Sequence, residues 1–435
     1  MIKRIGLIAL YSGLGQLFLI FSLKFFSYHS TPYYITRIGQ VDSLFQLILT
    51  IIALGLQSSA IRNIAIAKDW QDEYGKTQSA RFMLSLLMLS LVLLGFVKPQ
   101  IVLFALAPLV ALSGDYALYS TGHPVMGSFL ALVRILIPYI FLIAGVFLKQ
   151  AWSDFFFVTG IIIAYISTNI FISKYLGTKI FYTPKWINLK LYLQSLPLGV
   201  VTLALYFIGP GIILIMPFFY SPKTVAIVFL GLKLYTIFKG ILRIIHQAFV
   251  REMIRDEICL KVDNFGTLFG LSLVSFVYIF PNSFISTFFG TNYLNEKPFF
   301  YMLSCSALVY SLFSSSTTKA LFERKDIAYA QRSLVSSLIT ISFCIILAYA
   351  NSTSISAGIS LIAGELIFAV LMLDLLKKNI DLKDRLLFLF KNLYLIFIPF
   401  SVRLVGGDSF FCFFISLLLV SATITLVYFR KDFFY

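Results

Sequence analysis

The sequence predicts an all-α protein that crosses a membrane about fourteen times, and three observations lead to this prediction. First, 59% of the 435 residues are hydrophobic and only 12% are charged, whereas about 25% of the residues in a soluble domain are charged. Second, apolar stretches of about 20 residues, the length of a membrane-spanning helix, recur along the whole chain. Third, basic residues gather in alternate connections between these stretches.

The apolar stretches are predicted to be the spanning helices. The first follows Lys3 and Arg4, as in a signal peptide. It is long, has no clear cleavage site and precedes many similar stretches, so it is predicted to be a span. The fourteen predicted spans lie near 5–28, 38–62, 78–97, 100–120, 125–148, 154–174, 191–217, 222–247, 264–285, 298–320, 330–350, 354–376, 386–405 and 408–430.

The basic residues predict the orientation of these spans, because positive charge collects in short cytoplasmic loops. With the N-terminus inside, the cytoplasmic segments hold 24 of the 35 basic residues. The outer segments hold seven, namely Lys24, Arg37, Lys98, Lys149, Lys223, Lys297 and Arg403. We therefore expect both termini in the cytoplasm. The net charge of +16 is explained by loops that face anionic headgroups, and no nucleic-acid partner is expected.

Two polar stretches, near 175–190 and 377–391, divide the spans into six, six and two. The predicted domains are an N-terminal six-helix bundle (1–176), a C-terminal six-helix bundle (177–380) and a transmembrane hairpin (381–435). Both halves open with helix-breaking residues: Gly13 and Gly15 in the first span, and Gly209-Pro210-Gly211 followed by Pro217 in the seventh. Interrupted helices at matching positions are typical of transporters with internal repeats. Alternatively, these residues only ease helix packing.

Basic residues within the spans are candidate functional groups, because a charge near the centre of a bilayer costs at least about 2.5 kcal/mol. The eighth span holds Lys233 near its middle, and Lys239, Arg243 and His246 on one stripe. The alternative for that stripe is snorkelling to the headgroups. The remaining candidate cations are Arg134 inside the fifth span, Arg62 at the end of the second, and Lys24 and Arg37 near the outer end of the first.

Acidic residues within the spans are fewer. Glu365 lies near the middle of the twelfth span, Asp115 in the inner part of the fourth, and Asp42 near the outer end of the second. Glu365 or Asp115 could form an ion pair with Arg134 or Lys233. The other interpretation is a protonatable site that couples transport to an ion gradient. The residues leave both interpretations open.

Other chemistry is not indicated. The three histidines share no spacing, and the four cysteines lie far apart, so neither a metal site nor a disulfide framework is expected. The sequence has no GxxxxGK[ST] loop and no GxSxG elbow. We therefore expect no cofactor and no enzymatic activity. Cations in a membrane cavity bind anions, phosphates above all, which suggests an anionic lipid-linked substrate.

The stretch from Tyr34 to Ala67 resembles the start of bacterial polysaccharide flippases of the Wzx type. These belong to the MOP superfamily, which includes the MATE exporters and the lipid II flippase. The resemblance covers about 35 residues and rests on a basic residue and a glycine before the second helix, a nearby aromatic residue, and a helix end of the form GL-small-small-x-Arg. In this chain these are Arg37, Gly39, Phe45, Gly55, Leu56, Ser58, Ser59 and Arg62.

The resemblance implies two six-helix bundles around a central cavity, with the C-terminal hairpin as an addition. It also implies that cations of the first, second and eighth helices meet a pyrophosphate. By position, these are Lys24 or Arg37, Arg62, and Lys233 or Lys239. Arg134 and Arg243 complete the expected substrate-binding set, and Asp42, Asp115 and Glu365 are the candidates for ion coupling.

The expected function is transport of an oligosaccharide repeat linked to polyprenyl pyrophosphate, such as O-antigen, from the cytoplasmic to the outer leaflet. Alternating access coupled to an ion gradient would drive it, in a bacterial inner membrane. Expected partners are this lipid-linked substrate, membrane lipids, and the polysaccharide polymerase and chain-length machinery. One alternative is a MATE-type drug exporter, which needs a predominance of cavity acids. A second is an O-antigen polymerase or membrane glycosyltransferase, which typically has a large outer loop, whereas the longest here are near 29–38 and 286–297.

Overall fold

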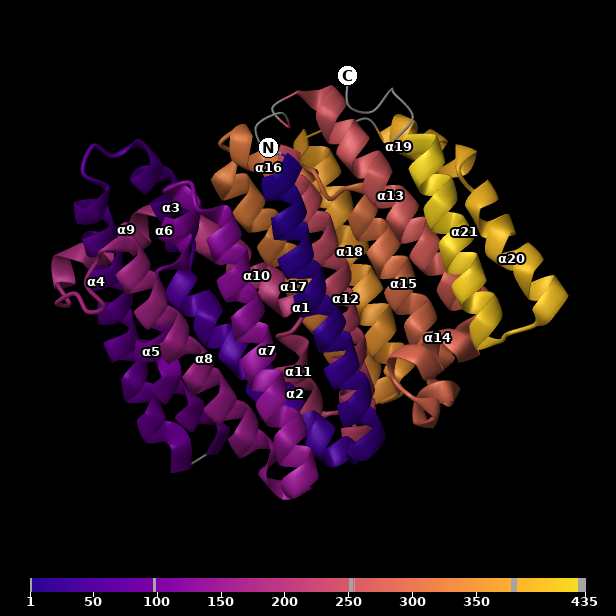
Figure 1. Cartoon of the computed structure of the whole chain (residues 1–435), viewed down its shortest axis with the longest axis horizontal. Helices are drawn as coiled ribbons and strands as arrows, with labels where there is room; N and C mark the ends of the chain where they lie inside the picture. The colour runs from indigo at the N-terminus through magenta and orange to yellow at the C-terminus, as the bar shows by residue number, and fades with distance from the viewer. Residues whose placement is uncertain (1, 97–98, 250–252, 254, 377–381, 429–435) are drawn as a thin grey trace. The chain divides into compact units, whose positions relative to one another are not determined.

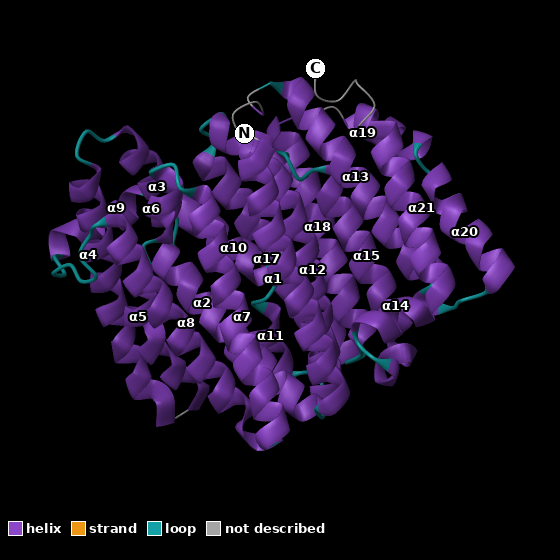
Figure 2. Ribbon diagram, viewed as in Figure 1, coloured by secondary structure: helices purple, strands orange, loops and turns teal. Residues whose placement is uncertain are grey.

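The computed structural model describes residues 2–96, 99–249, 253, 255–376 and 382–428, and these form helices joined by short loops, with no strand (Figure 2). The basic residues Lys98, Arg251, Lys377, Lys378, Arg430 and Lys431, counted above as loop residues, lie outside the described part. The chain forms two compact units, Met1–Phe218 and Phe219–Tyr435.

The first unit begins with the long helices α1 (Ile2–His29) and α2 (Pro32–Ala53) (Figure 1). Its other α-helices are α3 (Leu56–Ile66), α4 (Trp70–Leu89), α5 (Ala107–Ala111), α6 (Asp115–Ser120), α7 (Pro124–Leu148), α8 (Ser153–Leu176), α9 (Lys190–Gln194), α10 (Leu196–Phe207) and α11 (Ile212–Ile215). The 3-10 helices are η1 (Ser90–Phe96), η2 (Pro99–Leu106), η3 (Gln150–Trp152), η4 (Trp186–Leu189) and η5 (Met216–Phe218). Helix α7 packs between α1 and α8, and α2 packs against α8, α10 and η2.

The second unit is built on α12 (Pro222–Phe249), α13 (Asp256–Ile279) and α15 (Lys297–Leu312). Its other helices are α14 (Pro281–Phe288), η7 (Thr291–Glu296), α16 (Ser316–Phe322), α17 (Asp326–Ala350), α18 (Ser354–Leu376), α19 (Leu382–Lys391), α20 (Tyr394–Gly406) and α21 (Phe410–Tyr428). Helix α15 packs against α12, α13 and α18. The last two helices lie beside α13, in yellow in Figure 1.

The described residues contain twelve helices long and apolar enough to span a membrane, or thirteen if the bent pair Trp186–Gln194 and Leu196–Phe207 is one span. The apolar helix Phe410–Thr425 is shorter. The predicted polytopic all-α class is confirmed, and the predicted count of fourteen is approximate. Large apolar side chains on the surface, such as Phe147 at 72% exposure and Val405 at 92%, are as expected for helices that face lipid.

The first compact unit ends at Phe218, and the predicted domains, with a boundary after residue 176, stay a prediction. The seventh predicted span packs against α2 within the first unit. The Tyr192 hydroxyl donates to the Ile52 carbonyl at 2.7 Å, and the Tyr206 hydroxyl donates to the Ser43 carbonyl at 2.7 Å.

The predicted helix interruptions are present in the seventh span and absent from the first. Helix α10 ends at Phe207 before the Gly209-Pro210-Gly211 turn, and α11 begins at Ile212. Helix α1 instead continues through Gly13 and Gly15. A Cβ on Gly15 would lie 3.3 Å from Leu132 Cδ1, so this glycine lets α1 approach α7 closely. The packing interpretation therefore holds for the first span.

The second predicted span is also broken, which the sequence did not predict. Helix α2 ends at Ala53, and Leu54 and Gly55 have φ of 25° and 74° before α3 begins. This break contacts the bend between α9 and α10: a Cβ on Gly199 would lie 2.7 Å from the Leu54 carbonyl oxygen. Glycine is required here because the two backbones touch.

Candidate functional site

The first unit holds a polar cluster around Arg134, defined here as Arg134, Asp115, Ser113, Thr168 and Asn169. Arg134 Nη1 lies 3.2 Å from Asp115 Oδ2. The guanidinium also donates to Ser113 Oγ at 2.8 Å and to Thr168 Oγ1 at 3.0 Å. Its side chain is only 12% exposed. The structure therefore forms one of the ion pairs that the sequence left open.

This Arg134 cluster exists because the fourth span is broken. Helix α5 ends at Ala111 and α6 begins at Asp115, which leaves carbonyl groups at the break without helical partners. Arg81 from α4 donates to the carbonyls of Ser113 and Val110. Gln78 donates to the Leu112 carbonyl at 3.1 Å. Side chains of α4 thus donate hydrogen bonds to the carbonyl groups at the break. The Ser113 hydroxyl orients Asp115 by donating to its carboxylate at 2.9 Å.

Arg81 is a functional candidate that sequence reasoning missed. It was counted with the cytoplasmic basic residues, at the inner end of the third predicted span, but it lies well inside the Trp70–Gly95 span and is 3% exposed. The available signal was Asp69, which caps α4 by accepting a hydrogen bond from the Asp72 backbone N–H at 3.2 Å. A helix that begins at residue 70 places Arg81 three turns inside it.

The second unit holds a polar cluster around Lys239, defined here as Lys239, Glu365, Tyr235 and Tyr310. Lys239 Nζ lies 2.6 Å from Glu365 Oε1, and the Tyr235 hydroxyl donates to the same oxygen at 2.5 Å. The ammonium lies 4.3 Å and 4.5 Å from the centres of the Tyr235 and Tyr310 rings. The Lys239 side chain is 27% exposed and that of Glu365 is 3% exposed.

The other cations of the eighth span, which is α12, have different surroundings. Lys233, expected as the partner of a buried acid, is buried with its ammonium 5.6 Å from the centre of the Phe229 ring. Arg243 is exposed. His246 is within hydrogen-bond distance of Ser314, with 3.0 Å between Nε2 and Oγ. The structure therefore separates the predicted stripe: Lys239 pairs inside the unit and Arg243 remains at its surface.

A third cluster surrounds Asp263, which is fully buried on α13. Arg385 from α19 donates to Asp263 Oδ2 through Nη2 at 2.6 Å and Nε at 3.0 Å. The Ser315 N–H donates to Oδ1 at 2.7 Å, at the break between α15 and α16. Neither Asp263 nor Arg385 was a sequence candidate, because Asp263 precedes the predicted ninth span and Arg385 was assigned to a loop.

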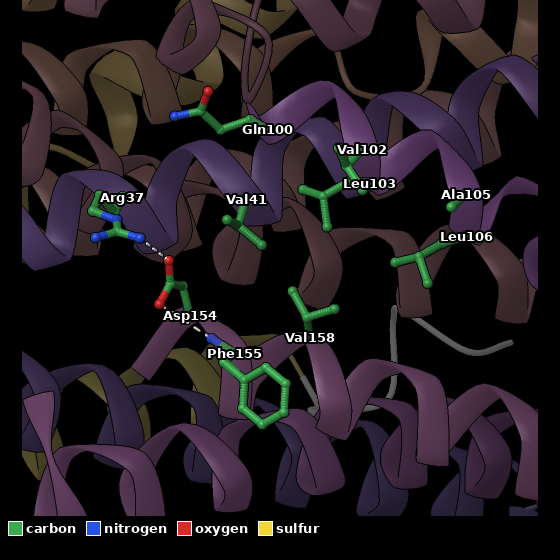
Figure 3. Close-up of a pocket in the computed structure, with 10 residues that line it drawn as sticks. All are labelled: Arg37, Val41, Gln100, Val102, Leu103, Ala105, Leu106, Asp154, Phe155 and Val158. Carbon is green, nitrogen blue, oxygen red and sulfur yellow. Dashed lines mark hydrogen bonds and ion pairs between the residues drawn. The ribbon is translucent and has the colours of Figure 1, made fainter. Parts of the chain in front are cut away.

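The predicted residues of the outer ends of the first two spans make other contacts. Arg37 pairs with Asp154 on α8, at one end of an apolar groove of about 430 Å³ (Figure 3). Lys24 is exposed on α1. Asp42 is buried and accepts a 2.6 Å hydrogen bond from Gln46. Arg62 lies in α3, and its side chain is outside the described residues.

Within each unit, then, only some of the predicted residues form ion pairs with one another. Arg134 meets Asp115, and Lys239 meets Glu365. Each pair contains one expected substrate-binding cation and one expected coupling acid. Both acids carry a partner that cancels their charge, so any anion that binds Arg134 or Lys239 competes with a carboxylate of the protein.

The comparisons with known proteins agree with this architecture. Neither a family model nor a curated protein matches the sequence. Among solved structures, the lipid II flippase MurJ in an inward closed conformation matches with a TM-score of 0.70 and 17% identity, over 98% of this chain and 99% of that chain. A MATE structure in complex with MaL6 matches with a TM-score of 0.50 and 14% identity, over 90% and 97%. The chain has the fold of these transporters. At these identities the likeness concerns the fold alone, so both the expected superfamily and the Wzx subtype stay proposals.

Proposed function

We propose that this protein is a flippase that moves an oligosaccharide repeat linked to polyprenyl pyrophosphate across the membrane by alternating access. The observation that carries the proposal is the full-length likeness to the lipid II flippase. Buried cations within spans agree with it, because the only large anionic group of such a substrate is its pyrophosphate. In the first unit, Arg134 pairs with Asp115, and Arg81 donates to backbone carbonyls at the same helix break.

The roles of the candidate residues follow from their exposure and partners. Lys239 and Arg134 are proposed to contact the pyrophosphate, since Lys and Arg form charge-assisted hydrogen bonds to phosphate oxygens. Arg37, Arg62, Lys24, Lys233 and Arg243 are proposed as further cations along the substrate path. Asp115 and Glu365 are proposed as coupling acids, because each is freed when its cation turns to the substrate. Asp42 stays a candidate of the same kind.

A MATE-type exporter is the second candidate, favoured by the likeness to MATE over 90% of this chain. A cationic drug would be repelled by Arg81, Arg134 and Lys239 unless acids outnumbered them. A polymerase or glycosyltransferase is disfavoured because the described outer connections are short: α1 ends at His29 and α2 begins at Pro32.

The test is to delete the gene in its host and measure both surface polysaccharide and lipid-linked intermediates. Accumulation of complete repeats on the lipid carrier, with none at the surface, supports the flippase. A single repeat that still reaches the surface without long chains indicates a polymerase. Unchanged polysaccharide together with new drug sensitivity favours the exporter.

A matched pair of variants tests the cations in the same host. Charge reversal at Arg134 or Lys239 should fail to restore polysaccharide, whereas reversal of the exposed Lys76, which pairs with Asp72 and Glu73 on the surface, should restore it. Protein levels in the membrane serve as the control. Full activity of both buried variants would contradict their proposed contact with the substrate.

A further inference from the structure

The Lys239 cluster contains a cation that occupies an acidic aromatic site. Two tyrosine rings and a carboxylate surround the ammonium of Lys239. Such a site binds a cation well, because the ring faces are negative and the carboxylate carries a full charge. Here the cation is tethered to the protein on α12, while Glu365 belongs to α18.

The two partners of this ion pair differ in their access to the surroundings. The Lys239 side chain is 27% exposed, whereas that of Glu365 is 3% exposed. The lysine side of the pair is therefore the accessible one, and the carboxylate is enclosed by protein. When Lys239 turns to a phosphate, Glu365 stays behind in a buried site without its counter-charge.

We infer, on the basis of the proposed function, that the pyrophosphate of the substrate and Glu365 compete for Lys239, so that substrate binding loads one proton onto Glu365. The ammonium moves from the carboxylate to the phosphate. The carboxylate then takes a proton from solvent and becomes a neutral acid, because an isolated buried charge is very costly. No other bond is made or broken. Release of the substrate reverses the exchange and expels the proton.

The groups around Glu365 support a proton as the exchanged ion. On α12 these are Lys239, Tyr235 and Arg243, whose charge acts on Tyr310 of the cluster, and Tyr310 itself stands on α15. Helix α17 contributes Tyr329, whose ring packs on Phe368 at 6.3 Å, and the Ser336 hydroxyl, which donates to the Gly364 carbonyl. Among the described contacts of the carboxylate, the only oxygen is the Tyr235 hydroxyl. A metal ion prefers several oxygen ligands, whereas a proton needs one.

The exchange has a thermodynamic consequence that can be measured. If binding takes up one proton, the affinity for the substrate falls as pH rises, by about tenfold per pH unit where the linkage is complete. Because the proton is bound and released together with the substrate, the exchange predicts that both are carried in the same direction. Such coupling requires that Glu365 be the group that titrates.

The experiment uses the full-length protein purified in detergent and farnesyl pyrophosphate as the probe. Isothermal titration calorimetry at pH 7 in two buffers of different ionisation enthalpy gives the number of protons taken up per probe bound. We expect about one for the wild type. E365Q should bind the probe without proton uptake. Y235F removes only the hydrogen bond from Tyr235 to Glu365 Oε1, so it should retain both probe binding and proton uptake. The control E296Q makes the same change in the Lys223–Glu296 pair of this unit and should behave as the wild type.

The outcomes separate this inference from the proposed function. Probe binding by the wild type without proton uptake, or equal uptake by a folded E365Q, overturns the exchange and leaves the flippase proposal intact. No binding of the probe by the wild type contradicts pyrophosphate recognition and overturns both. Uptake that disappears only in E365Q supports both.

Discussion

Charged residues inside the two units are held by contacts with neighbouring helices. Arg134 pairs with Asp115, Lys239 with Glu365 and Arg385 with Asp263. Arg81 instead donates to carbonyls at a helix break. A buried ion pair adds little net stability, but a single partner left behind is costly. Substitutions of one partner and of both partners should therefore behave differently.

The Arg134–Asp115 pair gives the first prediction. Arg134→Met should lower stability by about 3 kcal/mol, because Asp115 loses its ion-pair partner. Asp115→Asn in the same chain should recover part of this loss, since the amide needs no counter-charge. The measurement is the thermal midpoint of unfolding in detergent for both single variants and the double variant. Additive losses would contradict a direct pair.

Arg81 gives the second prediction. Arg81→Met removes the side-chain donor of the buried Ser113 carbonyl, so stability should fall by about 1–3 kcal/mol. Lys76→Met is the matched control on the same helix, because Lys76 is exposed and forms only surface pairs. It should change stability by no more than about 0.5 kcal/mol. Equal effects on the midpoint of unfolding would show that Arg81 is not structural.

Several spans are broken, and their breaks are where the charged side chains gather. Arg81 from the third predicted span satisfies the break between α5 and α6. In the second unit, Asp263 from α13 accepts a hydrogen bond from the Ser315 N–H at the break between α15 and α16. In each half, a charged side chain of one helix binds backbone groups at the break of another span. That side chain is basic in the first half and acidic in the second. This correspondence supports the predicted internal repeat more directly than the paired glycine motifs do.

The contact between the breaks of the second and seventh spans gives the third prediction. Gly199→Ala should destabilise the protein, because the new Cβ would lie 2.7 Å from a backbone oxygen of Leu54. Gly13→Ala is the matched control: nothing lies within 4 Å of its added Cβ. As a helix-interior change it should be neutral or stabilising by up to about 1 kcal/mol. Thermal midpoints that rise in both variants would contradict the contact.

The C-terminal hairpin gives the fourth prediction, because Arg385 joins it to α13 through a buried pair. Arg385→Met should destabilise the protein by about 3–5 kcal/mol, since Asp263 is 0% exposed and loses its cation. Asp263→Asn in the same chain should recover much of that loss. If Arg385→Met alone unfolds as the wild type does, the hairpin is not held by this pair.

At the scale of the whole molecule, the likeness to a lipid flippase extends over 98% of the chain. It includes the C-terminal helices, which pack on α13 and α14. The orientation of this fold in the membrane rests on the distribution of basic residues and stays a prediction.

Reporter fusions test the orientation and give the fifth prediction. With the N-terminus inside, alkaline phosphatase fused after Gln150 should be active, because that junction is predicted to lie outside. Fusions after Tyr182 and after Tyr435 should be inactive, whereas green fluorescent protein at the same two junctions should fluoresce. The reverse pattern would contradict the predicted topology. Both reporters at each junction control for expression.

Composition and charge by themselves determined that this chain is a polytopic helical membrane protein, because lipid demands long apolar helices wherever the backbone spans it. They also singled out Arg134, Lys239, Asp115 and Glu365 as candidate functional residues, because a charged side chain inside a span is costly. The helix break at Gly209-Pro210-Gly211 could be predicted because proline and glycine interrupt a helix through their own backbone properties.

Only the tertiary structure decided which charges meet and which apparent loop residues are buried. Lys239 pairs with Glu365, and Arg81 and Arg385 are buried although the sequence placed both among cytoplasmic basic residues. The break after Ala53 depends on the close approach of Gly199, far away in the sequence. These outcomes follow from packing between distant segments, which hydropathy and charge along one chain do not encode.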